Sequence, residues 1–189
     1  MKWMIACAAL AAVGVALGLP GTALAKDAQV GVADQVFAMM AAEGGQAEVQ
    51  LSKLAAGHAA SSEVKQLAQR LVQDHTKANQ ELMTIAKGKD ISLPKDVDDT
   101  HEDVVKLFSA LEGGQFDREF LSYQVMHHEK DVAAFSVQAK DGQDGELKAF
   151  AAKQLPILQE HLQQARQLAA QHHASRKSGQ AAERQSPTR

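Results

Sequence analysis

Apolar residues recur at steps of three and four along three long segments, and this spacing constrains the fold more than any other feature. One face of an α-helix presents residues with this period, whereas a half-buried strand alternates at every second residue. The three stripes comprise Val64, Leu67, Leu71, His75, Ala78, Leu82 and Ile85; Leu121, Val125, His128, Val132 and Phe135; and Leu147, Ala151, Gln154, Leu158, His161, Ala165 and Leu168. Each stripe indicates an amphipathic helix with one buried face.

Composition supports a helical protein, because Ala, Gln, Leu, Lys and Glu are abundant while strand-forming residues are scarce. The predicted long helices cover residues 30–57, 61–87, 115–140 and 146–173, and a shorter helix covers 97–112. Short connections make antiparallel hairpins of the first and last pairs, and the longer middle connection allows a crossover. The sequence therefore predicts an all-α fold, a ferritin-like four-helix bundle with a short crossover helix between its second and third long helices.

The amino-terminal segment has the features of a signal peptide over residues 1–25. Lys2 precedes an apolar run at 4–19, and Ala23-Leu24-Ala25 offers small residues for cleavage after Ala25. We therefore expect a periplasmic protein with no membrane span after cleavage, the alternative being an uncleaved anchor. The bundle domain is predicted over 26–173, followed by a disordered basic tail over 174–189.

Charge and motifs exclude several classes of function. Removal of the predicted signal peptide leaves a net charge of −4 and no cysteine, because Cys7 is the only one in the chain. There is no thiolate ligand, no disulfide and no basic stripe with interleaved aromatic residues, so we expect no nucleic-acid partner. Serine-elbow, phosphate-loop and zinc-protease motifs are also missing, which argues against a hydrolase.

Three histidines occupy positions where the apolar stripes call for leucine. His75, His128 and His161 lie near the middle of three different predicted helices, and the remaining helix offers Glu48 on its own small-residue stripe. One inward polar ligand from each of four helices is how bundle proteins build metal sites. Imidazole with carboxylate suits Zn, Cu, Fe or Ni, so the sequence predicts one divalent transition-metal ion in the bundle core.

Other acidic and histidine residues near these positions are substitutes or neighbours of the ligands. Counting residues from the first hairpin turn places Glu48 about 7 Å from the depth of His75, so Glu43 is an alternative ligand. Asp74, His127 and Glu129 flank the histidines and are possible outer partners. The chain has no Glu-x-x-His motif, which argues against a di-iron centre.

Two structural alternatives remain open for these features. The histidines could form a buried hydrogen-bond network that fixes the register of the helices, with no metal. Pro156, within the last predicted helix, removes a backbone N–H and could simply curve the helix or could open the bundle beside the site.

Four ordered segments, at 41–51, 71–79, 116–129 and 147–162, resemble the bacterial family called domain of unknown function 4142. The resemblance covers about residues 30–170 and implies a ferritin-like bundle in an extracytoplasmic protein, with no settled activity. Its motif residues correspond here to Glu48, Asp74, His75, Phe116, Asp117, Tyr123, His128 and His161. His127 departs from the pattern, because the family more often has an acid at this position.

The sequence supports a leading function and two alternatives. The leading hypothesis is an exported protein that binds a single metal ion for metal handling or a stress response. The first alternative is a non-catalytic helical module that binds a partner or the cell envelope, with structural histidines. The second is an enzyme, which would be a metal-dependent oxidase or peroxidase; the missing Glu-x-x-His motifs weigh against di-iron chemistry.

Overall fold

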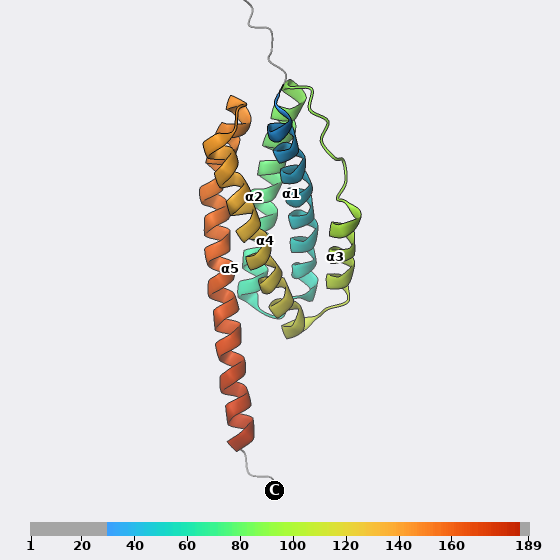
Figure 1. Cartoon of the computed structure of the whole chain (residues 1–189). Coiled ribbons are helices and arrows are strands. Elements are labelled where there is room, and N and C mark those ends of the chain that lie inside the picture. The colour runs from blue at the N-terminus through green and yellow to red at the C-terminus, as the bar shows by residue number, and fades with distance from the viewer. Residues whose placement is uncertain (1–29, 186–189) are drawn as a thin grey trace, which may run out of the picture.

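The computed structural model describes residues 30–185, and side chains over residues 30–175. Within that part, the chain forms five helices and no strand. The helices are α1 (Val32–His58), α2 (Ser62–Gly88), α3 (Asp99–Ser109), α4 (Gly113–Asp141) and α5 (Gly145–Gln185). The predicted all-α bundle with a short crossover helix is confirmed (Figure 1).

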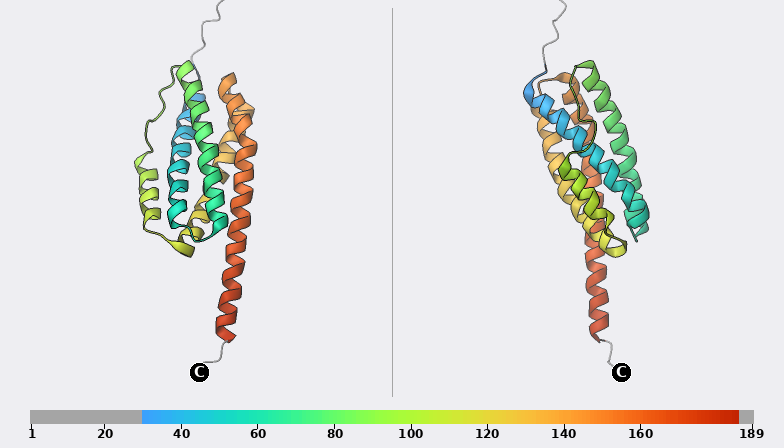
Figure 2. Two further views of the ribbon diagram at one scale, coloured as in Figure 1. Left: turned by 180° about the vertical axis from the view of Figure 1, so that it is seen from behind. Right: turned by 90° about the vertical axis from the view of Figure 1, so that its right-hand side faces the viewer.

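The four long helices form two antiparallel hairpins that pack side by side. Helices α1 and α2 make one hairpin and α4 and α5 make the other, and packing is most extensive within each hairpin. The segment after α2 runs back along the bundle to α3, which lies on the outside against α1 (Figures 1 and 2). This crossover brings α4 back to the end of the bundle where the α1–α2 turn lies.

Two buried aspartates join the hairpins at opposite ends of the bundle. Asp117 of α4 accepts hydrogen bonds from the backbone N–H groups of Ala60 and Ser61 in the α1–α2 turn, at 3.1 and 2.9 Å. Asp34 of α1 accepts hydrogen bonds from the backbone N–H groups of Gln143 and Asp144 in the α4–α5 turn, at 3.2 and 3.1 Å. Each hairpin therefore satisfies the free N–H groups at the turn of the other.

The core consists of two apolar clusters separated by one polar layer. The cluster nearer the α1–α2 turn includes Leu51, Leu67, Leu71, Phe116, Phe120 and Leu121. The cluster nearer the α4–α5 turn includes Phe37, Leu82, Phe135, Leu147, Phe150 and Leu158. Between them lies a layer of buried polar side chains. We define the polar layer by one residue from each long helix: Glu48, His75, His128 and His161.

The structure differs from the sequence prediction at the end of the last helix. Helix α5 continues to Gln185, whereas the prediction ended it at residue 173 and gave 174–189 as a disordered tail. The helix extends over 174–185 because alanine, glutamate, arginine and glutamine favour helix and Gly179 is the one glycine among them. Residues 186–189 and the predicted signal peptide lie outside the described part of the chain.

Two further features concern the continuity of α5 and the apolar character of the helices. Pro156 is exposed on the outer face of α5, and the helix runs through it without a break. None of the helices in the described region combines the length and apolar character that a membrane span requires.

Candidate metal site

The three histidine rings of the polar layer lie close together in the bundle core. His75, His128 and His161 are 6%, 0% and 1% exposed, and their ring centroids are separated by 5.4 to 5.6 Å. One ligand nitrogen from each lies within 4.8 Å of the other two. Nitrogens that share an ion at 2.0–2.1 Å lie about 3.3 to 3.6 Å apart. Small side-chain rotations would therefore close this group, the histidine triad, around one ion.

Each ring of the triad has a buried nitrogen with no hydrogen-bond partner. These atoms are Nε2 of His75, Nε2 of His128 and Nδ1 of His161. Nδ1 of His128 donates to the backbone carbonyl of Gln124 at 3.1 Å, and Nε2 of His161 donates to Asp74 Oδ2 at 3.0 Å. A carbonyl or carboxylate only accepts, so in the neutral rings the other nitrogen of His128 and His161 carries a lone pair. Metal-binding histidines are oriented by the same arrangement, in which one ring nitrogen donates to a carbonyl or carboxylate and the other binds the ion.

Burial keeps the three rings in the form that binds metal. Desolvation lowers the pKa of His75, His128 and His161 below the usual value for histidine. Asp74 acts in the opposite direction on His161, but burial outweighs it. The rings are therefore neutral at pH 7, and a metal ion would have no proton to displace from them.

Glu48 enters the polar layer from α1 and is paired with a different histidine. Its Oε2 accepts a hydrogen bond from Nε2 of Gln124 at 2.9 Å, and its Oε1 lies 3.0 Å from Nδ1 of His127. Burial alone would raise the pKa of Glu48, but the contact with His127 and the nearby rings of His128 and His75 lower it, so the carboxylate is ionised.

His127 lies at the edge of the layer as a cation. Its Nδ1 is 3.3 Å from Asp131 Oδ2 as well as 3.0 Å from Glu48 Oε1, and its ring stacks on Tyr123. Burial would lower its pKa, but the two carboxylates outweigh burial and raise the pKa of His127 to about 10. Ligand atoms of Glu48, His127 and His128 lie within 4.8 Å of one another, so His128 belongs to two possible ligand groups.

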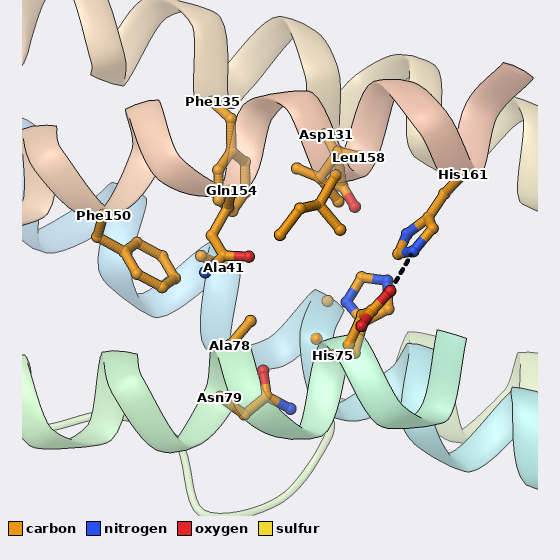
Figure 3. Close-up of a pocket in the computed structure, with 14 residues that line it drawn as sticks. Ala41, His75, Ala78, Asn79, Asp131, Phe135, Phe150, Gln154, Leu158 and His161 are labelled. Carbon is orange, nitrogen blue, oxygen red and sulfur yellow. Dashed lines mark hydrogen bonds and ion pairs between the residues drawn. The ribbon is translucent and has the colours of Figure 1, made fainter. Parts of the chain in front are cut away.

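A narrow cavity of about 30 Å³ lies beside the triad, between it and the apolar cluster near the α4–α5 turn. His75 and His161 border one end and Phe150 the other, with Asp131 and Gln154 between them (Figure 3). A space of this size holds one or two water molecules. An ion on the triad would therefore have room for a small additional ligand on this side.

Comparison with known proteins identifies the family of this chain. Residues 19–168 match the family described as Domain of unknown function (DUF4142). The chain belongs to the DUF4142 family. No curated protein matches the sequence.

One solved structure shares the fold of this DUF4142 chain. It is described as CopM in the Cu(I)-bound form, and the match covers 71% of this chain and 93% of that chain. The two chains are 20% identical, with a TM-score of 0.60. At this level of identity the likeness shows a shared helical-bundle fold.

The structure brings together the predicted residues of the DUF4142 chain only in part. The three histidines converge, and Glu48 reaches the same layer but forms the neighbouring group with His127. Asp74 lies behind His161 as an outer partner. Glu43 is half-buried and joins neither group, because residue counting gives the height of the backbone and not the reach of the side chain.

Two further residues, Glu129 and Gln124, differ from the sequence prediction. Glu129, a predicted outer partner, lies on the surface in an ion pair with Arg166. The sequence analysis missed Gln124, which is fully buried and contacts both Glu48 and His128. Its position three residues after Leu121 and four before His128 puts it beside the apolar stripe, and this spacing could have identified it.

Proposed function

We propose that this protein binds one transition-metal ion, copper above all, through His75, His128 and His161, and that it serves in metal handling. One observation carries the proposal: three rings from three helices converge in the core, and each has a buried nitrogen without a hydrogen-bond partner. A buried polar atom without a partner destabilises the fold by about 1 to 3 kcal/mol. A bound ion would satisfy all three atoms at once.

The ligand chemistry and the structural relative favour copper. Imidazole ligands without thiolate suit Zn, Cu, Fe or Ni. Three neutral imidazoles bring no negative charge, so a monovalent ion is easier to bury among them than a divalent one. The structure described as CopM holds Cu(I) in the same fold, which supports Cu(I) for this chain as well.

We further propose that the protein works in the periplasm. The support is the predicted signal peptide over residues 1–25 and a chain with no cysteine beyond it. Amino-terminal sequencing of the protein from the periplasmic fraction should begin at Lys26, and recovery of the uncleaved chain in the cytoplasm would contradict the proposal.

Anaerobic titration with Cu(I) against a chromophoric competing chelator tests the metal proposal directly. We expect one Cu(I) per chain, and we expect His75→Gln, His128→Gln and His161→Gln each to weaken binding by about 100-fold or more. His58→Gln is the matched control, because Nδ1 of His58 contacts the backbone carbonyl of Leu111 away from the triad.

Two results would contradict this function. Wild-type protein that binds no Cu(I), Zn(II) or Fe(II) would leave the polar layer with a purely structural role in fixing helix register. Binding that survives in the variant with all three substitutions would place the metal elsewhere. A melting curve for each variant shows that the bundle still folds.

A further inference from the structure

We infer that the polar layer offers one ion two alternative positions, and that His128 belongs to both. The first is the histidine triad, which suits a monovalent ion. The second lies between Glu48, His127 and His128 and suits a divalent ion. This inference rests on the proposed function, since it concerns how the same layer distinguishes ions by their charge.

The second position has the geometry of a ligand group. One ligand atom from each of Glu48, His127 and His128 lies within 4.8 Å of the others. Oε1 of Glu48 and Nε2 of His128 are both buried without a hydrogen-bond partner. Nδ1 of His127 is 3.0 Å from this oxygen, but the two are not aligned for a hydrogen bond. Each of the three residues of this group thus has a buried atom without a hydrogen-bond partner, and one of these atoms is an anionic oxygen.

The two positions exclude each other because they depend on the same lone pair. Nδ1 of His128 donates to the carbonyl of Gln124, so only Nε2 is free to bind an ion. One lone pair binds one ion. An ion on the triad therefore leaves the second position without a ligand, and an ion at Glu48 leaves the triad with two rings. The layer is a single-ion site with two arrangements, and it is not a dinuclear centre.

Charge separates the two arrangements. The triad supplies neutral rings, whereas the second position adds the carboxylate of Glu48, and Asp131 Oδ2 lies 3.3 Å from Nδ1 of His127. The free energy needed to bury an ion rises with the square of its charge, so a divalent ion gains most from two nearby carboxylates. The ion would take the lone pair of His127 Nδ1 and release one proton from that ring, replacing one positive charge with two.

A crossed experiment with two substitutions and two metals tests the inference. Cu(I) affinity is measured anaerobically by chelator competition, and Zn(II) affinity by competition with a chromophoric chelator. We expect His75→Gln to weaken Cu(I) binding by about 100-fold and Zn(II) binding by less than about threefold. We expect Glu48→Gln to show the reverse. Glutamine keeps an oxygen that can accept from Gln124, so the packing of the layer is preserved.

Further variants keep the test decisive if Glu48→Gln folds poorly. Like Glu48→Gln, His127→Gln should weaken Zn(II) binding strongly and Cu(I) binding only slightly. His101→Gln is the matched control, because this ring lies 6.2 Å from the ring of His127 but belongs to neither ligand group. The metal content of each complex should be one ion per chain.

The outcomes distinguish this inference from the proposed function. Equal dependence of both metals on His75 and Glu48 would mean one four-ligand site, and two ions bound at once would mean a dinuclear site. Either result overturns the inference while metal binding stands. A wild-type protein that binds neither metal overturns the proposed function itself.

Discussion

A histidine in a packed core destabilises the folded protein unless both of its ring nitrogens are satisfied. His75, His128 and His161 each carry one nitrogen that is not, although leucine would fit the same apolar stripe. Each is held in place by its surroundings, and for His128 and His161 a hydrogen bond fixes which nitrogen is free. The unpartnered nitrogens therefore lower the stability of the metal-free fold, as expected if they serve the proposed metal site.

Replacing His75 with leucine tests whether its unpartnered nitrogen lowers the stability of the metal-free protein. We expect His75→Leu to raise the free energy of unfolding of the metal-free protein by about 1 kcal/mol, because it removes an unpartnered polar atom at similar volume. The same variant should lose the stabilisation that Cu(I) gives the wild type. Urea denaturation with and without Cu(I) measures both effects. A less stable metal-free variant would show that the ring contributes to a structural hydrogen-bond network.

For individual residues, the sequence predicts which side chains face the core but not which of these side chains contact one another. The stripes identified the three histidines because period alone decides the buried face of a helix. The pairing of Glu48 with His127 depends on side-chain rotation at the contact between α1 and α4, which no spacing within one helix reveals. Gln124 lies beside the stripe of α4 at a core-facing position, but the sequence analysis did not recognise it as a buried partner of Glu48.

Among the helices, the hairpin turns depend on carboxylates from the opposite hairpin. Asp117 is 1% exposed and accepts two backbone N–H groups of the α1–α2 turn, and Asp34 does the same for the α4–α5 turn. These contacts fix the height of each hairpin against the other. The height of His75 relative to His128 and His161 therefore follows from them.

Asp117→Asn tests the role of these turn contacts. The amide keeps one oxygen but presents a donor to the second backbone N–H, so we expect the free energy of unfolding to fall by about 2 kcal/mol. Asp103→Asn, at an exposed position of α3, is the control and should change stability by less than about 0.5 kcal/mol. Chemical denaturation measures both, and equal effects of the two substitutions would contradict this role.

The positions of the helices could be predicted well, and their ends less well. Gly88, Gly113 and the Asp141-to-Gly145 segment mark turns by composition, and the structure places helix boundaries near all three. Helix α5 ends at Gln185, twelve residues beyond the predicted end, because the polar composition of this segment received more weight than its helix propensity.

On the scale of the whole molecule, the buried histidines change stability in opposite directions as the pH rises. Desolvation lowers the pKa of the three triad histidines, so the unfolded chain binds more protons than the folded one as the pH falls below about 6.5. Carboxylates raise the pKa of His127 to about 10, so above pH 6.5 the folded chain binds the extra proton. Stability therefore decreases on both sides of neutrality.

This balance predicts a maximum of stability near pH 7 for the metal-free protein. Urea denaturation at pH 5, 7 and 9.5 should show lower free energies of unfolding at both extremes. His127→Gln should remove most of the decrease between pH 7 and 9.5, because that decrease comes from the raised pKa of His127. An alkaline decrease of the same size in this variant would show that other groups cause it.

The triad is divided unevenly between the halves of the bundle, with His75 in the α1–α2 hairpin and His128 and His161 in the α4–α5 hairpin. An ion held by all three would act as a crosslink between two hairpins that otherwise meet through side-chain packing, hydrogen bonds and ion pairs. Binding of the ion would then hold the two hairpins together. Release of the ion would require either that the hairpins separate or that a competing ligand reaches the ion through the cavity beside the triad. The slower the two hairpins separate, the longer the bundle would retain the ion.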